Sequence, residues 1–198
     1  MGRAERAQAG DGTELARAHA TLARGVDFFI LYADHRMGGG VGTPPHARVL
    51  GNRLRELDRF LNILADEAAL CLGQRQSEVR AFTRLRNTPN KLRLVRAMMG
   101  IDGAEHARHR AIGRISACLH HCGGRIHAIS LLDDIVAAAG APESEDRCAS
   151  LPPDRAVLRI APWILVSIAE FYREIGDQLV DQVRSRPCSL TFRPEPSM

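Results

Sequence analysis

Residues 46–72 read HARVLGNRLRELDRFLNILADEAALCL, and this stretch decides the fold of the chain. Apolar residues recur in it at intervals of three and four, the spacing that places side chains on one face of an α-helix. The charged residues Arg53, Glu56, Arg59 and Asp66 lie away from that face. The pattern predicts a long amphipathic helix with one buried stripe, formed by Leu50, Leu54, Leu57, Leu61, Leu64 and Ala68.

A second long helix is expected before it, over residues 13–35. Its apolar residues also share one face and comprise Leu15, Leu22, Val26, Phe29 and Ala33. The segment between the two helices holds Gly38-Gly39-Gly40 and Pro44-Pro45, which interrupt helical structure. Two long helices joined by a short Gly/Pro loop indicate an antiparallel pair.

Shorter helices are expected in the middle of the chain. One covers residues 77–86, and the next begins with Thr88 as N-cap and Pro89 as first helical residue, ending near Gly100. Asp102 and Glu105 resemble a capping box that opens a further helix, which ends at Gly123. Residues 126–139 form another expected helix.

The end of the chain predicts an extended piece at 157–160 and a strong final helix at 162–184, in which we expect Trp163 and Phe171 to pack in the core. The inward-facing residues of that helix are Leu165, Ile168, Ala169, Tyr172, Ile175, Leu179 and Val183. The predicted fold class is all-α: a single-domain bundle over residues 13–185, built on two long antiparallel helices, with disordered tails at 1–12 and 186–198.

Composition restricts the class of protein further. The 198 residues are 45% hydrophobic and 25% charged, which is ordinary for a globular domain. The net charge of +4 permits an acidic partner such as RNA without requiring one. No run reaches the roughly 18 apolar residues of a membrane span, and the first dozen residues lack the apolar core of a signal peptide. Five scattered cysteines do not indicate a disulfide framework, so we expect a reduced, cytoplasmic protein without a membrane partner.

The segment richest in side chains that could take part in binding or catalysis is residues 114–127, RISACLHHCGGRIH. Arg114 is a fixed cation suited to a phosphate, whereas His120 and His121 exchange protons near neutral pH. Residues seven apart lie within about 20° of each other on a helix, while residues six apart diverge by about 120°. His121 is therefore the partner of Arg114 if the helix continues to Gly123. His120 takes that role if the last turn frays or a second subunit completes the site.

These residues resemble the signature of the HEPN domain family, an arginine followed after four to six residues by a histidine and often by a glycine-rich turn. The entry into the last helix at 158–162 and its segment 171–176 also resemble the closing helix of that family. Family members usually have a polar residue after the arginine, where this chain has Ile115. Arg86-Asn87 has the familiar dipeptide, but no histidine follows it within reach.

The resemblance implies a helical domain that dimerises and brings two Arg/His pairs to a shared cleft. Active relatives are ribonucleases that need no metal or other cofactor. Arg114 would stabilise charge on the phosphoryl oxygens, and His120 or His121 would act as general base or acid. The replacement of the usual polar residue by Ile115 bears on whether the domain is catalytic more than on its fold, because inactive family members are common. A non-catalytic helical interaction or dimerisation module, with a cognate partner protein, is the alternative.

Two other patterns in the sequence are candidate sites. Cys118 and Cys122, four residues apart, share a helix face with histidines between them, but the spacing matches no common zinc pattern, so no metal site is expected. Basic residues concentrated in the middle of the chain are the best candidate for a nucleic-acid surface, although a solvated helix face is the favoured interpretation because Pro89 interrupts them and no aromatic residues lie between them. The residues assigned to that surface are Arg84, Arg86, Lys91, Arg93, Arg96 and Arg110, with Arg80 beside them.

Overall fold

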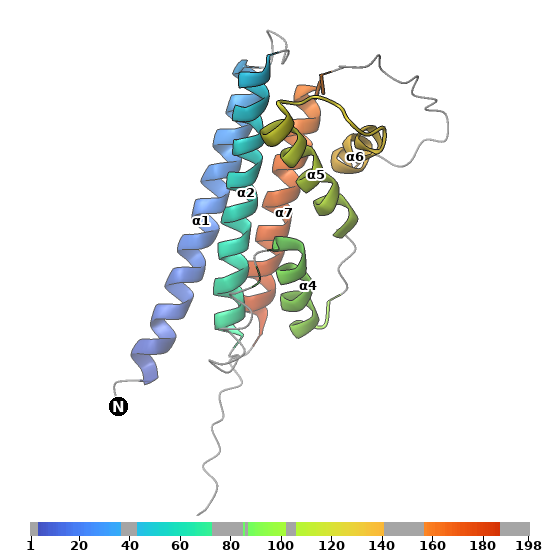
Figure 1. Ribbon diagram of the computed structural model, residues 1–198. Helices are drawn as coiled ribbons and strands as arrows, with labels where there is room; N and C mark the ends of the chain where they lie inside the picture. Colours follow the sequence, from blue (N-terminus) through green and yellow to red (C-terminus); the bar gives the residue numbers. More distant parts are fainter. Residues whose placement is uncertain are drawn as a thin grey trace, which may run out of the picture.

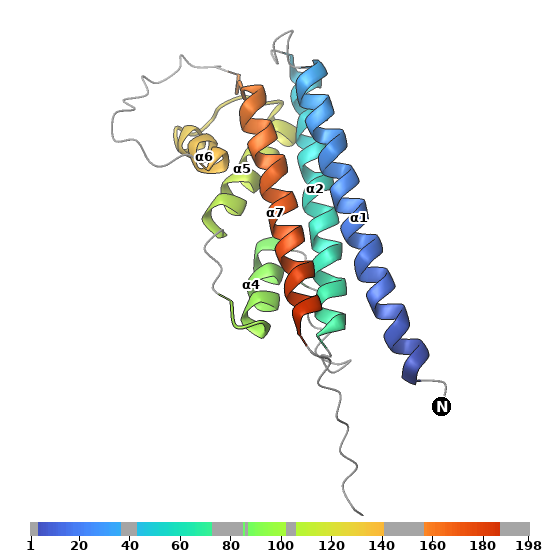
Figure 2. The same cartoon turned by 180° about the vertical axis from the view of Figure 1, so that it is seen from behind.

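The computed structural model describes residues 4–36, 43–72, 85, 87–101, 106–140 and 157–186, with side chains in the first range from 12 to 34. These residues form an all-α bundle, which confirms the predicted fold class (Figures 1 and 2). The helices are α1 (Ala4–Arg36), α2 (Pro44–Cys71), α4 (Thr88–Met98), α5 (His106–Cys122), α6 (Ser130–Ala139) and α7 (Pro162–Ser185). None of these described helices is long and apolar enough to cross a membrane.

Three long helices form the body of the bundle. α1 and α2 run antiparallel, as the Gly/Pro segment between them predicts, and α7 packs against both (Figure 1). The shorter helices α4, α5 and α6 lie on the other side of α2 and α7 from α1 (Figures 1 and 2). α2 contacts α1, α4, α5 and α7, so its leucine stripe faces the centre of the molecule.

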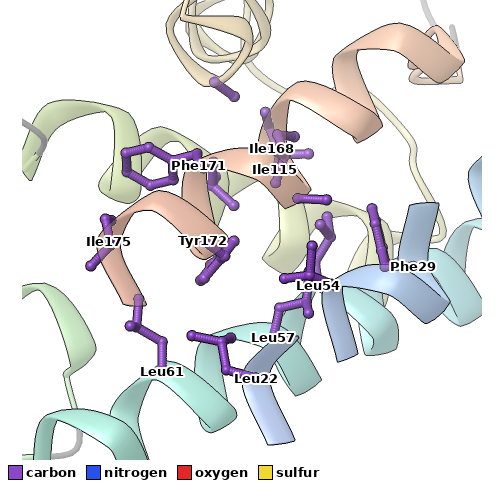
Figure 3. Close-up of a cluster of buried hydrophobic side chains, with 14 of the residues drawn as sticks. Leu22, Phe29, Leu54, Leu57, Leu61, Ile115, Ile168, Phe171, Tyr172 and Ile175 are labelled. Atoms are coloured by element: carbon purple, nitrogen blue, oxygen red, sulfur yellow. The ribbon is translucent and has the colours of Figure 1, made fainter. Parts of the chain in front are cut away.

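The core follows the predicted stripes. Every stripe residue expected on α1 and α2 is buried, and Phe171 and Tyr172 of α7 meet them from the opposite side (Figure 3). Trp163 was expected in the core, but it is 57% exposed. It is the second residue of α7, and Ile164 and Leu165 directly after it are buried, so the first turn directs Trp163 to its exposed side.

Several predicted boundaries shift. α1 begins at Ala4, within the expected N-terminal tail. The N-cap of α4 is Asn87 rather than Thr88, because Asn87 Oδ1 accepts a hydrogen bond from the Asn90 backbone N–H at 3.3 Å. Arg186, expected in the C-terminal tail, donates to the carbonyls of Met98 and Met99. The capping box at 102–105, the tail at 187–198 and the expected helix at 77–86, apart from residue 85, lie outside the described residues.

A close crossing of α2 and α5 fixes the position of the histidine pair. A Cβ on Gly51 would lie 2.7 Å from the backbone nitrogen of His120, so only glycine lets the helices approach this closely. Ser116 Oγ donates to the Gly51 carbonyl at 3.1 Å across the same crossing. α5 then ends in Gly123 and Gly124, which have φ of +59° and +78° and turn the chain away from the helix axis.

Candidate nucleic-acid interface

A groove between α2 and α5 contains the predicted arginine and one of the two histidines. It has a volume of about 570 Å³ and is lined mainly by α2, α4 and α5. Arg114 and His121 both line it, whereas His120 does not. α5 is helical to Cys122, so the continuous-helix alternative applies and residues seven apart share a face. We call this feature the α2–α5 groove. Its lining residues are Leu54, Arg55, Asp58, Asn87, Thr88, Pro89, His109, Arg110, Ile112, Gly113, Arg114, Ser116, Ala117, His121 and Tyr172.

Arg114 is held by a carboxylate of α6. Its Nε donates to Asp134 Oδ2 at 2.7 Å, and its Nη2 donates to Asp134 Oδ1. The Asp134 side chain is 7% exposed, whereas that of Arg114 is 53% exposed and has Nη1 outside the pair. This bidentate hydrogen bonding raises the pKa of Arg114. The guanidinium is therefore oriented, and about half of the Arg114 side chain remains exposed at the groove.

A second arginine of α5 fixes the helix that carries Asp134. Arg108 Nε donates to the Ala138 carbonyl at 3.0 Å, and its Nη2 donates to the Ser167 carbonyl and hydroxyl. Its guanidinium also lies 4.5 Å from the centre of the Phe171 ring. A cation at the C-terminal end of α6 satisfies free helix carbonyls and complements the helix dipole. Arg108 thus links α5, α6 and α7 behind Arg114.

The two adjacent histidines have different surroundings. His121 is exposed, while His120 is half-buried and its Nδ1 is buried without a hydrogen-bond partner. Burial, together with the positive charges of Arg55, His121 and Arg48, lowers the pKa of His120. The two rings meet edge to face, with centroids 4.5 Å apart. His121 is the histidine available to a ligand in the groove.

A second hollow adjoins the groove at the end of α5. It has a volume of about 450 Å³ and shares His121 with the groove. Its other basic lining residues are Arg48 on α2 and Arg125 and His127 after α5. Arg48 and Arg55 are seven residues apart and therefore project from one side of α2. We call the two hollows together the basic face, and define it by Arg48, Arg55, Arg110, Arg114, His121, Arg125 and His127.

Among the described residues, the carboxylates at the basic face already have partners within the chain. Asp134 binds Arg114. Asp58 accepts from the Thr88 hydroxyl at 2.7 Å through one oxygen and lies 2.7 Å from His109 Nε2 through the other. The basic face therefore has a surplus of arginine charge, which favours an anionic ligand.

The predicted nucleic-acid surface is corrected in part. Lys91 is 1% exposed and its Nζ contacts Asp66 at 2.6 Å, so it cannot reach a nucleic acid. Arg96 is 5% exposed and donates to Gln178, so it is also part of the interior. Each points inward to a polar partner on another helix, Lys91 to Asp66 of α2 and Arg96 to Gln178 of α7. Arg93 is exposed on α4, and Arg110 lies in the groove. Arg84 and Arg86, with Arg80, lie outside the described residues.

Sequence reasoning missed three arginines of the basic face: Arg48, Arg55 and Arg125. The signal for Arg125 was its place directly after the Gly123-Gly124 turn. Arg48 and Arg55 had the seven-residue spacing, but nothing in the sequence indicates that the α5 histidines pack beside them. That contact depends on Gly51 and the crossing of α2 with α5.

The two cysteines of α5 differ in their surroundings. Cys118 is buried and its thiol donates to the Arg125 carbonyl at 3.3 Å, while Cys122 is exposed. Burial, with Cys122 nearby, raises the pKa of Cys118 to about 11. Across the described ranges, no group of three or more histidines, cysteines or carboxylates is arranged to hold a metal ion.

Comparison with known proteins does not assign the chain to a family. No family model, curated protein or solved structure matches the chain.

Proposed function

We propose that this protein binds RNA on its basic face and cleaves it there with Arg114 and His121. The observation that carries the proposal is the position of His121, which lies between two adjoining hollows lined by five arginines. Arg114 lines the same groove, oriented by Asp134. An arginine and a histidine that face one groove can grip a phosphodiester and move a proton beside it. The resemblance to the HEPN family supports the same assignment.

Binding rests on the arginine charge. For single-stranded RNA, each arginine that contacts a phosphate contributes about −0.7 to the slope of the logarithm of the binding constant against the logarithm of the salt concentration, and we count five such arginines. We therefore expect the Kd for a single-stranded RNA to rise by roughly 50–150-fold between 50 and 200 mM salt. Arginine planes also stack on exposed bases, which favours single-stranded regions over a regular duplex.

Cleavage follows from groups already in the groove. His121 takes the proton of an RNA 2′-hydroxyl, whose oxygen bonds to the adjacent phosphorus. The bond from phosphorus to the 5′ oxygen then breaks, that oxygen takes a proton from a water molecule, and the hydroxide left behind takes the proton held by His121. Arg114 stabilises the negative charge on the phosphoryl oxygens. The products are a 2′,3′-cyclic phosphate and a 5′-hydroxyl.

Binding is tested by fluorescence anisotropy with an end-labelled single-stranded RNA. Arg48→Gln/Arg55→Gln should weaken binding by about tenfold. It should also reduce the magnitude of the slope of log binding constant against log salt concentration by about 1.4. The control Arg24→Gln/Arg184→Gln removes the same charge from exposed residues of α1 and α7, away from the basic face. Equal losses in the two variants would refute the assignment of the face.

Cleavage is tested on the same RNA with and without EDTA. His121→Asn should slow cleavage by about 10²–10⁴ and leave RNA binding in place. His19→Asn, a change at a histidine of α1 away from the basic face, should cleave normally. Arg114→Ala and His120→Ala/His121→Ala should also be inactive but folded. An RNA with a single 2′-deoxy position should resist cleavage at that linkage. Normal cleavage by His121→Asn would refute its role.

A non-catalytic RNA-binding module is the second candidate, and two observations favour it. Asp134 already neutralises much of the Arg114 charge. Ile115 is 0% exposed and belongs to the core, so this chain uses for packing the position that is usually polar in the HEPN family. Wild-type protein that binds RNA with the predicted salt dependence but leaves it intact would support this candidate and refute the nuclease.

A further inference from the structure

A small cavity lies where α4, α5 and α7 come together, on the side of the bundle away from α1 (Figure 2). It has a volume of about 180 Å³. The proposed function does not use this cavity, which we call the α4–α5–α7 cavity. Its lining residues are Pro89, Leu92, Arg93, Arg96, His106, His109 and Ile175.

The two histidines of the cavity each have a buried ring nitrogen without a partner. His106 and His109 lie three residues apart on α5, and no described residue forms a hydrogen bond with Nδ1 of either ring. The whole His109 residue is only 3% exposed. Buried polar atoms are nearly always hydrogen-bonded in proteins, so two such nitrogens beside one cavity indicate a ligand.

Asp58 determines which hydrogen bond His109 can still make. Asp58 Oδ1 lies 2.7 Å from His109 Nε2, and a carboxylate only accepts, so Nε2 carries the proton. In the neutral imidazole, Nδ1 then has a lone pair and accepts a hydrogen bond. Asp58 lines the α2–α5 groove and not the cavity, so Nδ1 is the ring nitrogen left for a ligand of the cavity. A hydroxyl group is a donor that suits it.

Two arginines of α4 give the cavity its positive charge. Arg96 is 5% exposed, and its Nη2 is held by Gln178 Oε1 at 3.1 Å. Arg93 is exposed and lines the cavity from the same helix. No carboxylate is among the described residues that line it. These charges favour an anion and oppose a metal ion, which two histidines could otherwise bind.

The volume and the apolar wall restrict the anion to a short organic acid. A cavity of about 150 Å³ holds benzene, so this one has room for roughly six or seven non-hydrogen atoms. Pockets for drug-sized ligands begin at about 300 Å³, which excludes a nucleotide. Leu92 and Ile175 are 6% and 1% exposed and offer contacts to a short hydrocarbon chain. Inorganic phosphate has no apolar part to place against them.

We propose that the α4–α5–α7 cavity binds a short-chain hydroxy acid. The carboxylate of the acid lies beside Arg93 and accepts a hydrogen bond from His106. Its hydroxyl donates to His109 Nδ1, and its hydrocarbon part contacts Leu92 and Ile175. The cavity shares His109 with the α2–α5 groove, but binding of the acid does not require that the groove bind RNA.

The first test is a titration of the full, isotope-labelled chain with 3-hydroxybutanoate, followed by amide NMR spectra at constant ionic strength. We expect saturable shifts around the cavity on α4, α5 and α7, with a Kd of about 1 mM. Butanoate, which lacks the hydroxyl, should bind about fivefold more weakly. Octanoate is too long for the cavity and should leave these amides unshifted.

Several outcomes of this titration would overturn the proposal. One is the absence of saturation by about 20 mM acid, and another is a set of shifts on the basic face instead of around the cavity. Equal affinity for butanoate would remove the role of His109. Inorganic phosphate or zinc bound at the same amides more tightly than the acid would exclude an organic anion as the ligand.

The second test uses variants with the same titration. Arg93→Gln should weaken binding by about tenfold, because it removes a charge that bonds the carboxylate. The matched control is Arg184→Gln, which removes an exposed arginine of α7 outside the cavity lining and should bind normally. His106→Phe keeps a ring at that position and should also weaken binding. Equal affinities of Arg93→Gln and Arg184→Gln would refute the assignment of the site.

Discussion

The only lysine of the chain provides a stringent test of the structure, because it is buried. Lys91 Nζ donates to both oxygens of Asp66, at 2.6 and 2.7 Å, and to Asn62 Oδ1 at 2.8 Å. Burial raises the pKa of Asp66, while Lys91 opposes that rise. The ammonium thus satisfies two side chains of α2 from α4.

Lys91→Met keeps the length of the side chain and removes the ammonium. Loss of one partner of a buried pair costs about 3–5 kcal/mol. The Asp66 side chain is 23% exposed, so water can partly replace the lysine, and we expect a loss of about 2–3 kcal/mol. If the free energy of unfolding falls by about 2 kcal/mol per molar urea, the urea concentration at the unfolding midpoint should fall by about 1–1.5 M.

The measurement is urea unfolding followed by circular dichroism at 222 nm. Arg93→Met, two residues along the same helix but exposed, is the control and should change the stability by less than about 0.5 kcal/mol. Lys91→Met/Asp66→Asn removes both charges and should recover more than half of the loss. If Lys91→Met costs no more than Arg93→Met, the buried ion pair does not exist as described.

Three further predictions test the α2–α5 crossing. Gly51→Ala should destabilise the protein by about 1–3 kcal/mol, because its Cβ would lie 2.7 Å from a backbone atom. Gly113→Ala, whose Cβ would have no heavy atom within 4 Å, should stabilise the protein by about 0.5–1 kcal/mol. Thermal unfolding of the two variants tests both expectations. Iodoacetamide at pH 8 should modify exposed Cys122 and spare Cys118, whose pKa is about 11; equal labelling in a peptide map would contradict this. The pKa of His120 is lowered below its usual 6.5, so the unfolded chain binds a proton first, and stability should fall as the pH drops below about 6.5. His120→Asn should weaken that pH dependence in urea unfolding at pH 8 and pH 5.5.

Much of the candidate site was predictable from spacing. Helical periodicity places Arg114 and His121 on one face, and both line one groove. The same reasoning misplaced Lys91 and Arg96, because basic composition does not reveal which way a side chain points when its helix lies between others. A long basic side chain can enter the interior where a carboxylate or amide receives it, as Asp66 and Asn62 receive Lys91.

The sequence by itself determined the helical class, the long antiparallel pair and the buried stripes, because these depend on local periodicity and on glycine and proline between the helices. Only the tertiary structure decided which charges are exposed and which are neutralised. Asp134 reaches Arg114 from another helix, and Arg48 and Arg55 reach the histidines across a crossing that Gly51 permits. Such contacts depend on how helices dock, and residues distant in sequence contribute to them without any local signal.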